Sequence, residues 1–287
     1  MNSSSLLSDT LIDALLSARL HDPFRLLGVH HTPEGWRLRV FQPAADAVWL
    51  RLPTGVAPLE RVHRAGLFEW CGTQPPPAPH VLGVSEGGKV RETHDPYAFA
   101  PVLSGHDLYL FNEGRLRQAW RALGSHVEER SGVTGTRFAV WAPNAERVSV
   151  VGDFNRWDGR MHPMAVHGSS GVWELFIPDL RGGELYKYEI RNRATGEVML
   201  KTDPYAREFE RRPATAARVR AEGAYPWSDA GWMEHRRNWD WQHAPMSIYE
   251  VHLGSWRRAP ESGDRWLSYR EIAPLLAEHV AALGFTH

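Results

Sequence analysis

Residues 40–48 read Val-Phe-Gln-Pro-Ala-Ala-Asp-Ala-Val, and residues 140–148 read Val-Trp-Ala-Pro-Asn-Ala-Glu-Arg-Val, so one pattern recurs at an offset of 100 residues. In both copies an apolar run ends at a proline-containing turn, and a second apolar run begins after it. Apolar runs separated by such turns are typical of consecutive β-strands. The stretch therefore predicts a strand, a turn and a strand, made twice.

Two further matches follow in the same order. Residues 66–70 (Gly-Leu-Phe-Glu-Trp) resemble residues 171–175 (Gly-Val-Trp-Glu-Leu), and Asp-Pro-Tyr-Ala occurs at 95–98 and again at 203–206. Ordered matches at a nearly constant offset indicate a duplicated unit, with the offset growing through loop insertions. We therefore predict two copies of one module.

The two modules are expected at residues 21–120 and 125–225. Both are rich in short alternating apolar runs bounded by Pro, Asn and Gly, a pattern that favours strands. Such strands at regular spacing predict a mainly β fold of two immunoglobulin-like β-sandwiches in tandem. The clearest runs are Trp36–Phe41, Val48–Leu52, Thr136–Trp141 and Arg147–Val151.

A short amphipathic helix is expected ahead of the modules, within residues 1–20. Apolar residues recur there at helical spacing after the capping candidates Ser8 and Asp9. We expect this helix to pack on the first module. The apolar positions are Leu11, Ala14, Leu15 and Ala18.

The pattern changes after residue 225. A tryptophan-rich connector covers residues 226–246, and Ser247–Leu253 reads as one buried strand. A capping-box spacing at Ser268 then opens a helical pattern that ends at Gly284, with Pro274 near its start. Residues 247–287 therefore predict one βα unit and the first residues of a second strand.

Composition and charge exclude several classes of protein. The 33 Lys and Arg against 34 Asp and Glu argue against a large nucleic-acid surface, and the best basic stretch is mixed with glutamates. No apolar run reaches the roughly 18 residues of a membrane helix, so no membrane partner and a cytoplasmic location are expected. Cys71 is the single cysteine and no zinc-ligand spacing occurs, so neither a metal nor a cofactor is expected. The basic stretch contains Arg211, Arg212, Arg218 and Arg220.

The 13 tryptophans keep carbohydrate binding open, because indole rings either fill β-rich cores or stack on sugar rings. Residues 152–159 (Gly-Asp-Phe-Asn-Arg-Trp-Asp-Gly) lie between strands, where a loop can present an indole. Lys187 alternates with Tyr186 and Tyr188 and should lie on the opposite face of their strand. On spacing alone, a structural Trp157 and a solvated Lys187 are the simpler interpretations.

Five motifs together resemble bacterial 1,4-α-glucan (glycogen) branching enzymes of the α-amylase superfamily, over essentially the whole chain. The resemblance implies that 125–225 is an isoamylase-type glucan-binding module and that the segment from 247 opens a catalytic (β/α)8 barrel. It also implies glucan contacts at Trp157 and Lys187, and we add Asn155 of the same loop as a candidate. The motifs are Asp-Pro-Phe-Arg-Leu-Leu-Gly at 22–28, Trp-Ala-Pro-Asn-Ala at 141–145, Gly-Asp-Phe-Asn-Arg-Trp at 152–157, Tyr-Lys-Tyr-Glu at 186–189 and Tyr-Glu-Val-His-Leu-Gly-Ser-Trp-Arg-Arg at 249–258.

One departure from the resemblance concerns affinity. Related glucan-binding modules carry a second platform tryptophan three residues before the Asp-Pro motif, and here that position is Leu200. A stacked aromatic contributes about 1 kcal/mol, so glucan binding is expected to be weak.

The resemblance implies a retaining transfer of an α-1,4 glucan segment to a 6-hydroxyl, as in glycogen biosynthesis, with a carboxylate nucleophile and a carboxylic acid. A barrel needs about 200 residues, whereas 247–287 supplies 41, so no catalytic residue is expected here and this chain alone is predicted to be inactive. Two alternatives stay open. One is a free-standing glucan-binding or regulatory module, and the other is part of a debranching or trehalose-releasing relative.

Overall fold

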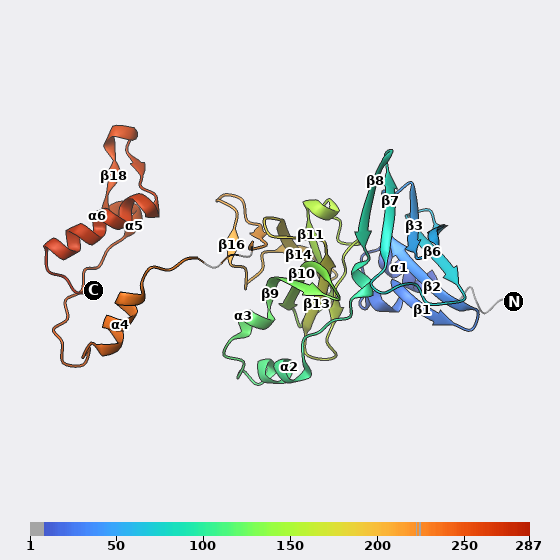
Figure 1. Ribbon diagram of the computed structural model, residues 1–287, viewed down its shortest axis with the longest axis horizontal. Coiled ribbons are helices and arrows are strands. Elements are labelled where there is room, and N and C mark those ends of the chain that lie inside the picture. The colour runs from blue at the N-terminus through green and yellow to red at the C-terminus, as the bar shows by residue number, and fades with distance from the viewer. Residues whose placement is uncertain (1–8, 222, 224) are drawn as a thin grey trace. The chain divides into compact units, whose positions relative to one another are not determined.

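The computed structural model describes residues 9–221, 223 and 225–287. The chain divides into two compact units, Met1–Gly223 and Ala224–His287. In Figure 1 the strands of the first unit form a blue-to-cyan group and a green-to-yellow group, which correspond to two successive sandwiches. The prediction of a mainly β fold with tandem sandwiches is confirmed.

The first sandwich has two antiparallel sheets, in the strand orders β1-β2-β6-β5 and β4-β3-β7-β8. Alternate residues of these strands are apolar and meet between the sheets; Leu38, Leu50 and Leu82, for example, are at most 1% exposed. The strands are β1 Gly28–Thr32, β2 Gly35–Phe41, β3 Ala47–Leu52, β4 Gly55–Pro58, β5 Glu60–His63, β6 Leu67–Gly72, β7 Val81–Glu86 and β8 Lys89–His94.

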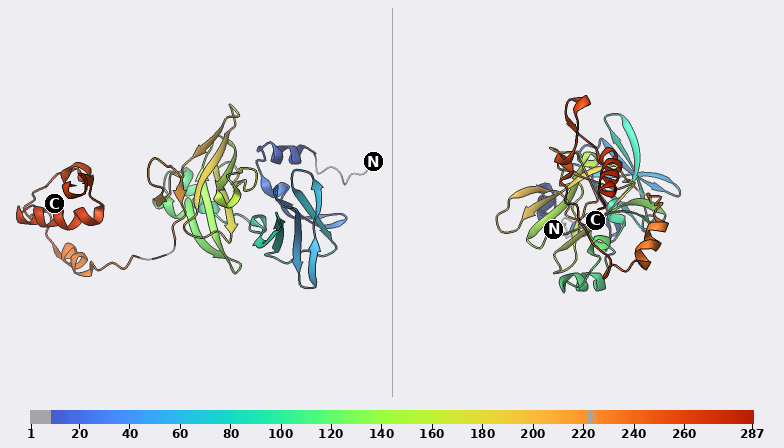
Figure 2. Two further views of the ribbon diagram at one scale, coloured as in Figure 1. Left: turned by 90° about the horizontal axis from the view of Figure 1, so that it is seen from above. Right: turned by 90° about the vertical axis from the view of Figure 1, so that its left-hand side faces the viewer.

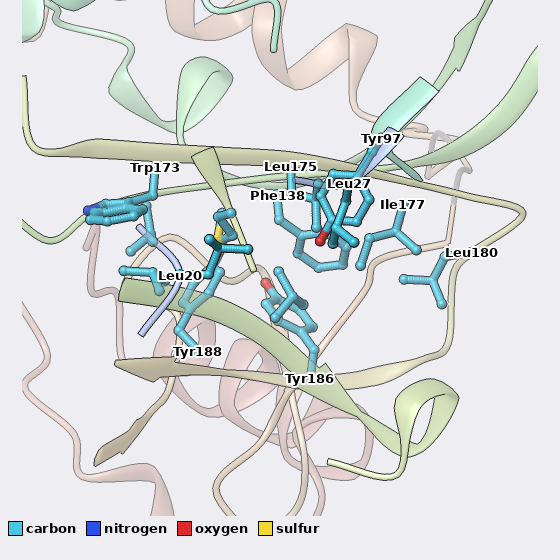
Figure 3. Packing of buried hydrophobic residues seen from close by; sticks show 14 of the residues in the cluster. Leu20, Leu27, Tyr97, Phe138, Trp173, Leu175, Ile177, Leu180, Tyr186 and Tyr188 are labelled. Atoms are coloured by element: carbon cyan, nitrogen blue, oxygen red, sulfur yellow. The ribbon is translucent and has the colours of Figure 1, made fainter. Parts of the chain in front are cut away.

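The second sandwich pairs a β12-β13-β10-β9 sheet with a β11-β14-β17-β16 sheet, and β15 adds to β14. Its core includes Phe138, Trp173 and Tyr188, all at most 1% exposed (Figure 3). The strands are β9 Gly124–Arg130, β10 Val133–Trp141, β11 Ala145–Gly152, β12 Ala165–Val166, β13 Val172–Pro178, β14 Leu185–Asn192, β15 Val198–Lys201, β16 Glu208–Phe209 and β17 Ala217–Arg218.

The sandwiches share one apolar cluster. Figure 3 shows Leu27 and Tyr97 of the first copy close to Phe138 and Leu175 of the second. The Tyr97 hydroxyl also donates to the carbonyl oxygen of Pro163 at 3.1 Å. The two modules are therefore joined by a buried apolar contact.

Helix α1 (Asp9–Leu16) confirms the predicted N-terminal helix, while the capping candidate Ser8 lies outside the described residues. The prediction that this helix packs on the first module was incomplete, because the helix also contacts the second module. Leu15 belongs to the cluster that both sandwiches share, and Arg147 Nε of the second donates to the carbonyl oxygen of Ala18 at 2.9 Å. The helix spacing identifies an apolar face but does not specify which module covers it.

The duplicated Asp-Pro turns adopt the same geometry. Asp95 Oδ1 accepts from the N–H of Tyr97 at 3.1 Å, and Asp203 Oδ1 accepts from the N–H of Tyr205 at 2.8 Å. Both aspartates are 1% exposed, so each carboxylate caps a buried turn. This geometry gives the repeated aspartates a structural role.

A fourth match between the copies emerges from the structure. Leu27-Gly28-Val29-His30 and Leu123-Gly124-Ser125-His126 both place a histidine Nε2 near the carbonyl oxygen of the leucine, at 3.2 and 2.9 Å. Gly28 and Gly124 have positive φ, and a Cβ on either would meet the backbone oxygen of the tyrosine in its Asp-Pro turn, at 2.9 and 3.1 Å. The duplication thus extends to the contact between first strand and turn.

The segment between the sandwiches contains η3 (Pro96–Ala98), α2 (Gly105–Asn112) and α3 (Ala119–Ala122). Glu174 in β13 binds this segment. Its fully buried carboxylate accepts from the N–H groups of Val102 and Leu103, both at 2.9 Å, and from Arg130 Nη2 at 3.1 Å. Burial opposes ionisation, but hydrogen bonds from His167, the two N–H groups and Arg130 outweigh it and lower the pKa of Glu174 to about 2.

We predict that Glu174→Gln destabilises the protein near neutral pH by about 3 kcal/mol, because the pKa of Glu174 in the folded protein, about 2, lies well below its value of 4.5 in the unfolded chain. Because the pKa of Glu174 is lower in the folded than in the unfolded chain, its ionised carboxylate stabilises the fold at pH values above about 4.5. This stabilisation is lost as the pH falls from 4.5 toward 2. Urea unfolding of wild type and variant along a pH series measures this. The difference should shrink below about pH 4.5.

The matched control is Glu146→Gln, which removes a partly exposed partner of Arg191 and should cost under about 1 kcal/mol. An equal difference between wild type and Glu174→Gln at neutral and acidic pH would contradict the assignment.

The second unit, orange to red in Figure 2, contains three α-helices and one short hairpin among its described residues. The predicted capping box is confirmed: the N–H of Ser268 donates to Glu271 Oε2 at 2.8 Å, and α6 continues through Pro274. The elements are α4 Ala230–Asn238, α5 Leu253–Trp256, β18 Arg258–Ala259, η5 Pro260–Ser262, β19 Arg265–Trp266 and α6 Tyr269–Ala282.

The predicted strand at 247–253 was wrong over most of its length. No strand is assigned there, and α5 begins at Leu253. However, the N–H of His287 donates to Ser247 O at 3.0 Å and the N–H of Tyr249 donates to His287 O at 2.7 Å, which is the parallel pairing pattern. Ile248 remains 66% exposed, so a ladder of this length does not bury the apolar run.

We predict that trypsin cleaves the chain first in α4, after Arg236 or Arg237. This nine-residue helix has no buried residue, and a helix of that length is marginal without packing. Mass spectrometry of the products should find a resistant fragment that contains both sandwiches. A chain that resists digestion through residue 287 would contradict the prediction.

Candidate functional site

The loop at 152–159 lies on the outer face of the β11–β14 pair. A Cβ on Gly152 would be 2.2 Å from the carbonyl oxygen of Leu185, and a Cβ on Gly159 would be 2.0 Å from Glu189 Oε1. Only glycine permits such close approach at the two ends of the loop. The loop is therefore pressed against the sheet at both ends.

Arg147 holds the far end of this loop. Its side chain is 1% exposed; Nη1 donates to Gly159 O at 3.0 Å and to Ser149 Oγ at 2.7 Å, and Nη2 donates to Glu189 Oε1 at 2.6 Å. Nε donates to Ala18 O at 2.9 Å. The buried guanidinium thereby connects the loop, both strands and the end of the N-terminal helix.

Asn155 lies inside the loop and is 1% exposed. Its Oδ1 accepts from the N–H of Gly152 at 3.0 Å, while Nδ2 donates to Val150 O at 2.9 Å and contacts His162 Nδ1 at 2.8 Å. Burial, with the charge of Arg91, lowers the pKa of His162 to about 4, so the neutral ring can accept this bond. The amide of Asn155 is thus occupied in fixing the loop.

Trp157 is half-buried and held by the same loop. Its indole Nε1 donates to Asp153 Oδ1 at 2.7 Å, and its backbone N–H donates to Gly152 O at 2.9 Å. Arg156 and Trp157 both have left-handed backbone, with φ of 57° and 59°. Such conformations cost about 1–3 kcal/mol each and cluster at functional sites, so the orientation of this indole is imposed by its surroundings.

Lys187 lies on β14 beside the start of the loop, because Val151 pairs with Lys187 and Gly152 pairs with Tyr186. Tyr186 and Tyr188 are fully buried and Lys187 is half-buried, so the predicted alternation is confirmed. The Lys187 ammonium donates to Thr215 Oγ1 at 2.7 Å.

Leu200 lies on the neighbouring strand β15, opposite Glu189 in register, and is 52% exposed. Residues opposite each other in an antiparallel pair share a face, so Leu200, Glu189 and Lys187 lie on the outer face together. The position at which related modules carry a second platform tryptophan is thus occupied by a leucine, whose side chain is smaller than an indole and is not flat.

The sequence predicted the loop, Trp157 and Lys187 as site candidates; it did not point to Arg147, Asp153 and Glu189, which hold the loop in the structure. Arg147 did carry a signal: it alternates with Val148 and Val150 at the start of a predicted strand, which places it on the face opposite the core. Its partner Glu189 could not be predicted from the local sequence, because it lies 42 residues away along the chain.

Neither a metal-binding group nor a membrane-spanning helix is found in the described part of the chain. There, no group of three or more His, Cys, Asp or Glu could hold a metal ion, and no helix is long and apolar enough to cross a membrane. Cys71 is exposed, and partial burial followed by the charge of Glu69 raises the pKa of its thiol, which does not favour reactivity.

Comparisons with known proteins match both sandwiches. Residues 8–97 match the N-terminal domain of alpha-1,4-glucan branching enzyme GlgB, and residues 122–206 match carbohydrate-binding module 48, the isoamylase N-terminal domain. The chain is 55% identical over 279 residues to the 1,4-alpha-glucan branching enzyme GlgB of Methylobacillus flagellatus, covering 97% of this chain and 38% of that enzyme. The GlgB of Nitrosomonas europaea is 55% identical over 281 residues, with the same coverages.

A solved structure, pullulanase type I of Bacillus subtilis complexed with maltose, is 17% identical and covers 70% of this chain and 28% of its own, at a TM-score of 0.32. A superposition this loose supports no argument.

The second sandwich, with its indole-bearing loop, matches carbohydrate-binding module 48, which defines the class of this part of the protein: a carbohydrate-binding module. Within that class, the chain carries the N-terminal domains of the GlgB family and corresponds to the N-terminal portion of 1,4-alpha-glucan branching enzymes. It spans about two fifths of the length of the curated relatives it matches. The predicted resemblance to the N-terminal part of branching enzymes is thereby confirmed. These relatives do not support the debranching alternative.

Proposed function

We propose that the second sandwich binds α-1,4-glucan through Trp157 and Lys187. The observation that carries the proposal is the indole of Trp157, fixed by Asp153 in a strained loop on an outward sheet face. A flat apolar ring stacks on the carbon face of a glucose unit, and the ammonium of Lys187 on β14 donates to hydroxyl oxygens of the glucan. Asn155 acts indirectly, by fixing the loop.

The binding is expected to be weak. One indole and one lysine offer a small contact, and Leu200 supplies only an aliphatic patch beside them. Weak binding suits a module that holds a long polymer near a catalytic domain, because tethering raises the effective concentration without strong single contacts.

For the whole protein we propose the activity of the named relatives: cleavage of an α-1,4 glucan and transfer of the segment to a 6-hydroxyl, in the cytoplasm. A retaining mechanism of this type needs two carboxyl groups about 5 Å apart. We assign neither group to a residue of the present chain, whose proposed part is to bind and orient glucan.

We predict that Trp157→Ala weakens binding to glycogen about fivefold, since a stacked aromatic contributes about 1 kcal/mol. Affinity electrophoresis in gels with increasing glycogen measures the change, and circular dichroism checks folding. Trp157→Phe, which keeps a ring, should lose less.

The matched control for Trp157→Ala is Trp141→Ala, because Trp141 is 52% exposed on the same sandwich but lies outside the loop. Unchanged migration of folded Trp157→Ala would remove Trp157 from the site.

We also predict that the purified 287-residue chain leaves the iodine colour of amylose unchanged, because no catalytic carboxyl pair is assigned to it. Absorbance of the iodine complex over time measures this. A progressive loss of colour that persists after repurification would refute the assignment.

A further inference from the structure

Trp49 of the first sandwich is an indole that the proposed site does not use. It lies on β3 between Val48 and Leu50, which are buried in the core at 1% and 0% exposure. Successive strand residues point to opposite faces, so Trp49 projects from the outer face of its sheet. It is half-buried there.

The indole lies directly over Gly83 of the neighbouring strand. A Cβ on Gly83 would be 2.0 Å from Nε1 and 2.1 Å from Cε2 of Trp49. Gly83 is the residue paired with Trp49 in register, so the ring crosses onto β7 and rests on its backbone. One side of the ring is covered by the strand, and the residue as a whole remains partly exposed.

Polar and apolar groups surround this ring at the surface. Pro58 pairs with Trp49 on one side, and Glu92 pairs with Gly83 on the other. Arg51 forms an ion pair with Glu92, and their side chains are 56% and 51% exposed. Guanidinium donors and carboxylate acceptors therefore stand beside a flat apolar ring.

Trp49 lies on the sheet of the first sandwich that corresponds, through the duplication, to the Lys187-bearing sheet of the second sandwich. At the offset of 100 residues, β3 corresponds to β11, and Trp49 corresponds to Ser149. In the second copy the long loop after β11 covers this face, and Ser149 is fully buried. In the first copy only Pro53 and Thr54 separate β3 from β4, so no such loop covers Trp49.

We propose that the outer face of the β4-β3-β7-β8 sheet is a second carbohydrate site, in which Trp49 stacks on a glucose unit and Arg51 and Glu92 bind its hydroxyl groups. The choice of α-glucan as ligand rests on the proposed function of the second sandwich. In this proposal the corresponding sheet of each sandwich binds carbohydrate. The second sandwich presents its indole from a loop, and the first presents its indole from a strand. A purely structural Trp49, which only shields Gly83, is the competing interpretation.

The test follows the indole N–H signals of the whole chain, labelled with ¹⁵N, during titration with maltoheptaose. Trp49→Phe assigns the Trp49 signal and Trp157→Phe assigns that of Trp157. We expect the Trp49 signal to shift in wild type and in Trp157→Ala. The internal control is Trp70, whose ring lies over Gly72 of its own strand and packs against the core; its signal should not move.

The outcomes separate this inference from the proposed function. A moving Trp157 signal with a fixed Trp49 signal overturns the second site and leaves the first. If neither moves, both proposals fail.

Affinity electrophoresis in glycogen gels supplies an independent measurement. We expect the Trp49→Ala/Trp157→Ala double variant to bind glycogen at least fivefold more weakly than Trp157→Ala alone, from the usual contribution of a stacked ring, about 1 kcal/mol. The control is Val62→Ala, since Val62 is 44% exposed on β5, which belongs to the other sheet, and its binding should equal that of wild type. Equal binding by the double and single variants, with both folded, would overturn the second site.

Discussion

The buried guanidinium of Arg147 is the interaction on which the arrangement of the second sandwich depends. It neutralises Glu189, caps the carbonyl group of Gly159 and receives the end of the N-terminal segment at Ala18. An unpaired buried arginine would be costly, so these partners must form together. The loop that carries Trp157 is therefore ordered by the same contact that attaches the N-terminal helix to the module.

The two copies show how one scaffold can present an indole in two ways. Both retain the Asp-Pro turn and the close approach of a glycine to it, which connect the first strand of each sandwich to this turn. They differ in the connection after the corresponding strands β3 and β11. A long loop covers Ser149 and carries Trp157, whereas a two-residue turn leaves Trp49 uncovered. Loop length thus decides where the aromatic surface lies.

The second unit illustrates a different balance between local and long-range structure. The capping box at Ser268 is a local signal, and α6 forms where it predicts. The apolar run at 247–253 is a strand signal that requires neighbours on both sides, and only Ser247 and Tyr249 form backbone hydrogen bonds, with residues 286 and 287. Strand propensity without partners therefore yields an exposed Ile248 instead of a ladder.

The amino-acid sequence alone determined the duplicated β-sandwich and the loop that bears Trp157, because alternation, turn residues and repeat offset are local patterns. It also placed Lys187 opposite the core tyrosines. Only the tertiary structure decided that Asn155 is buried, that Arg147 pairs with Glu189, and that Trp49 lies over Gly83. Those facts depend on residues that are distant along the chain and become neighbours only when the strands pair, which no local pattern encodes.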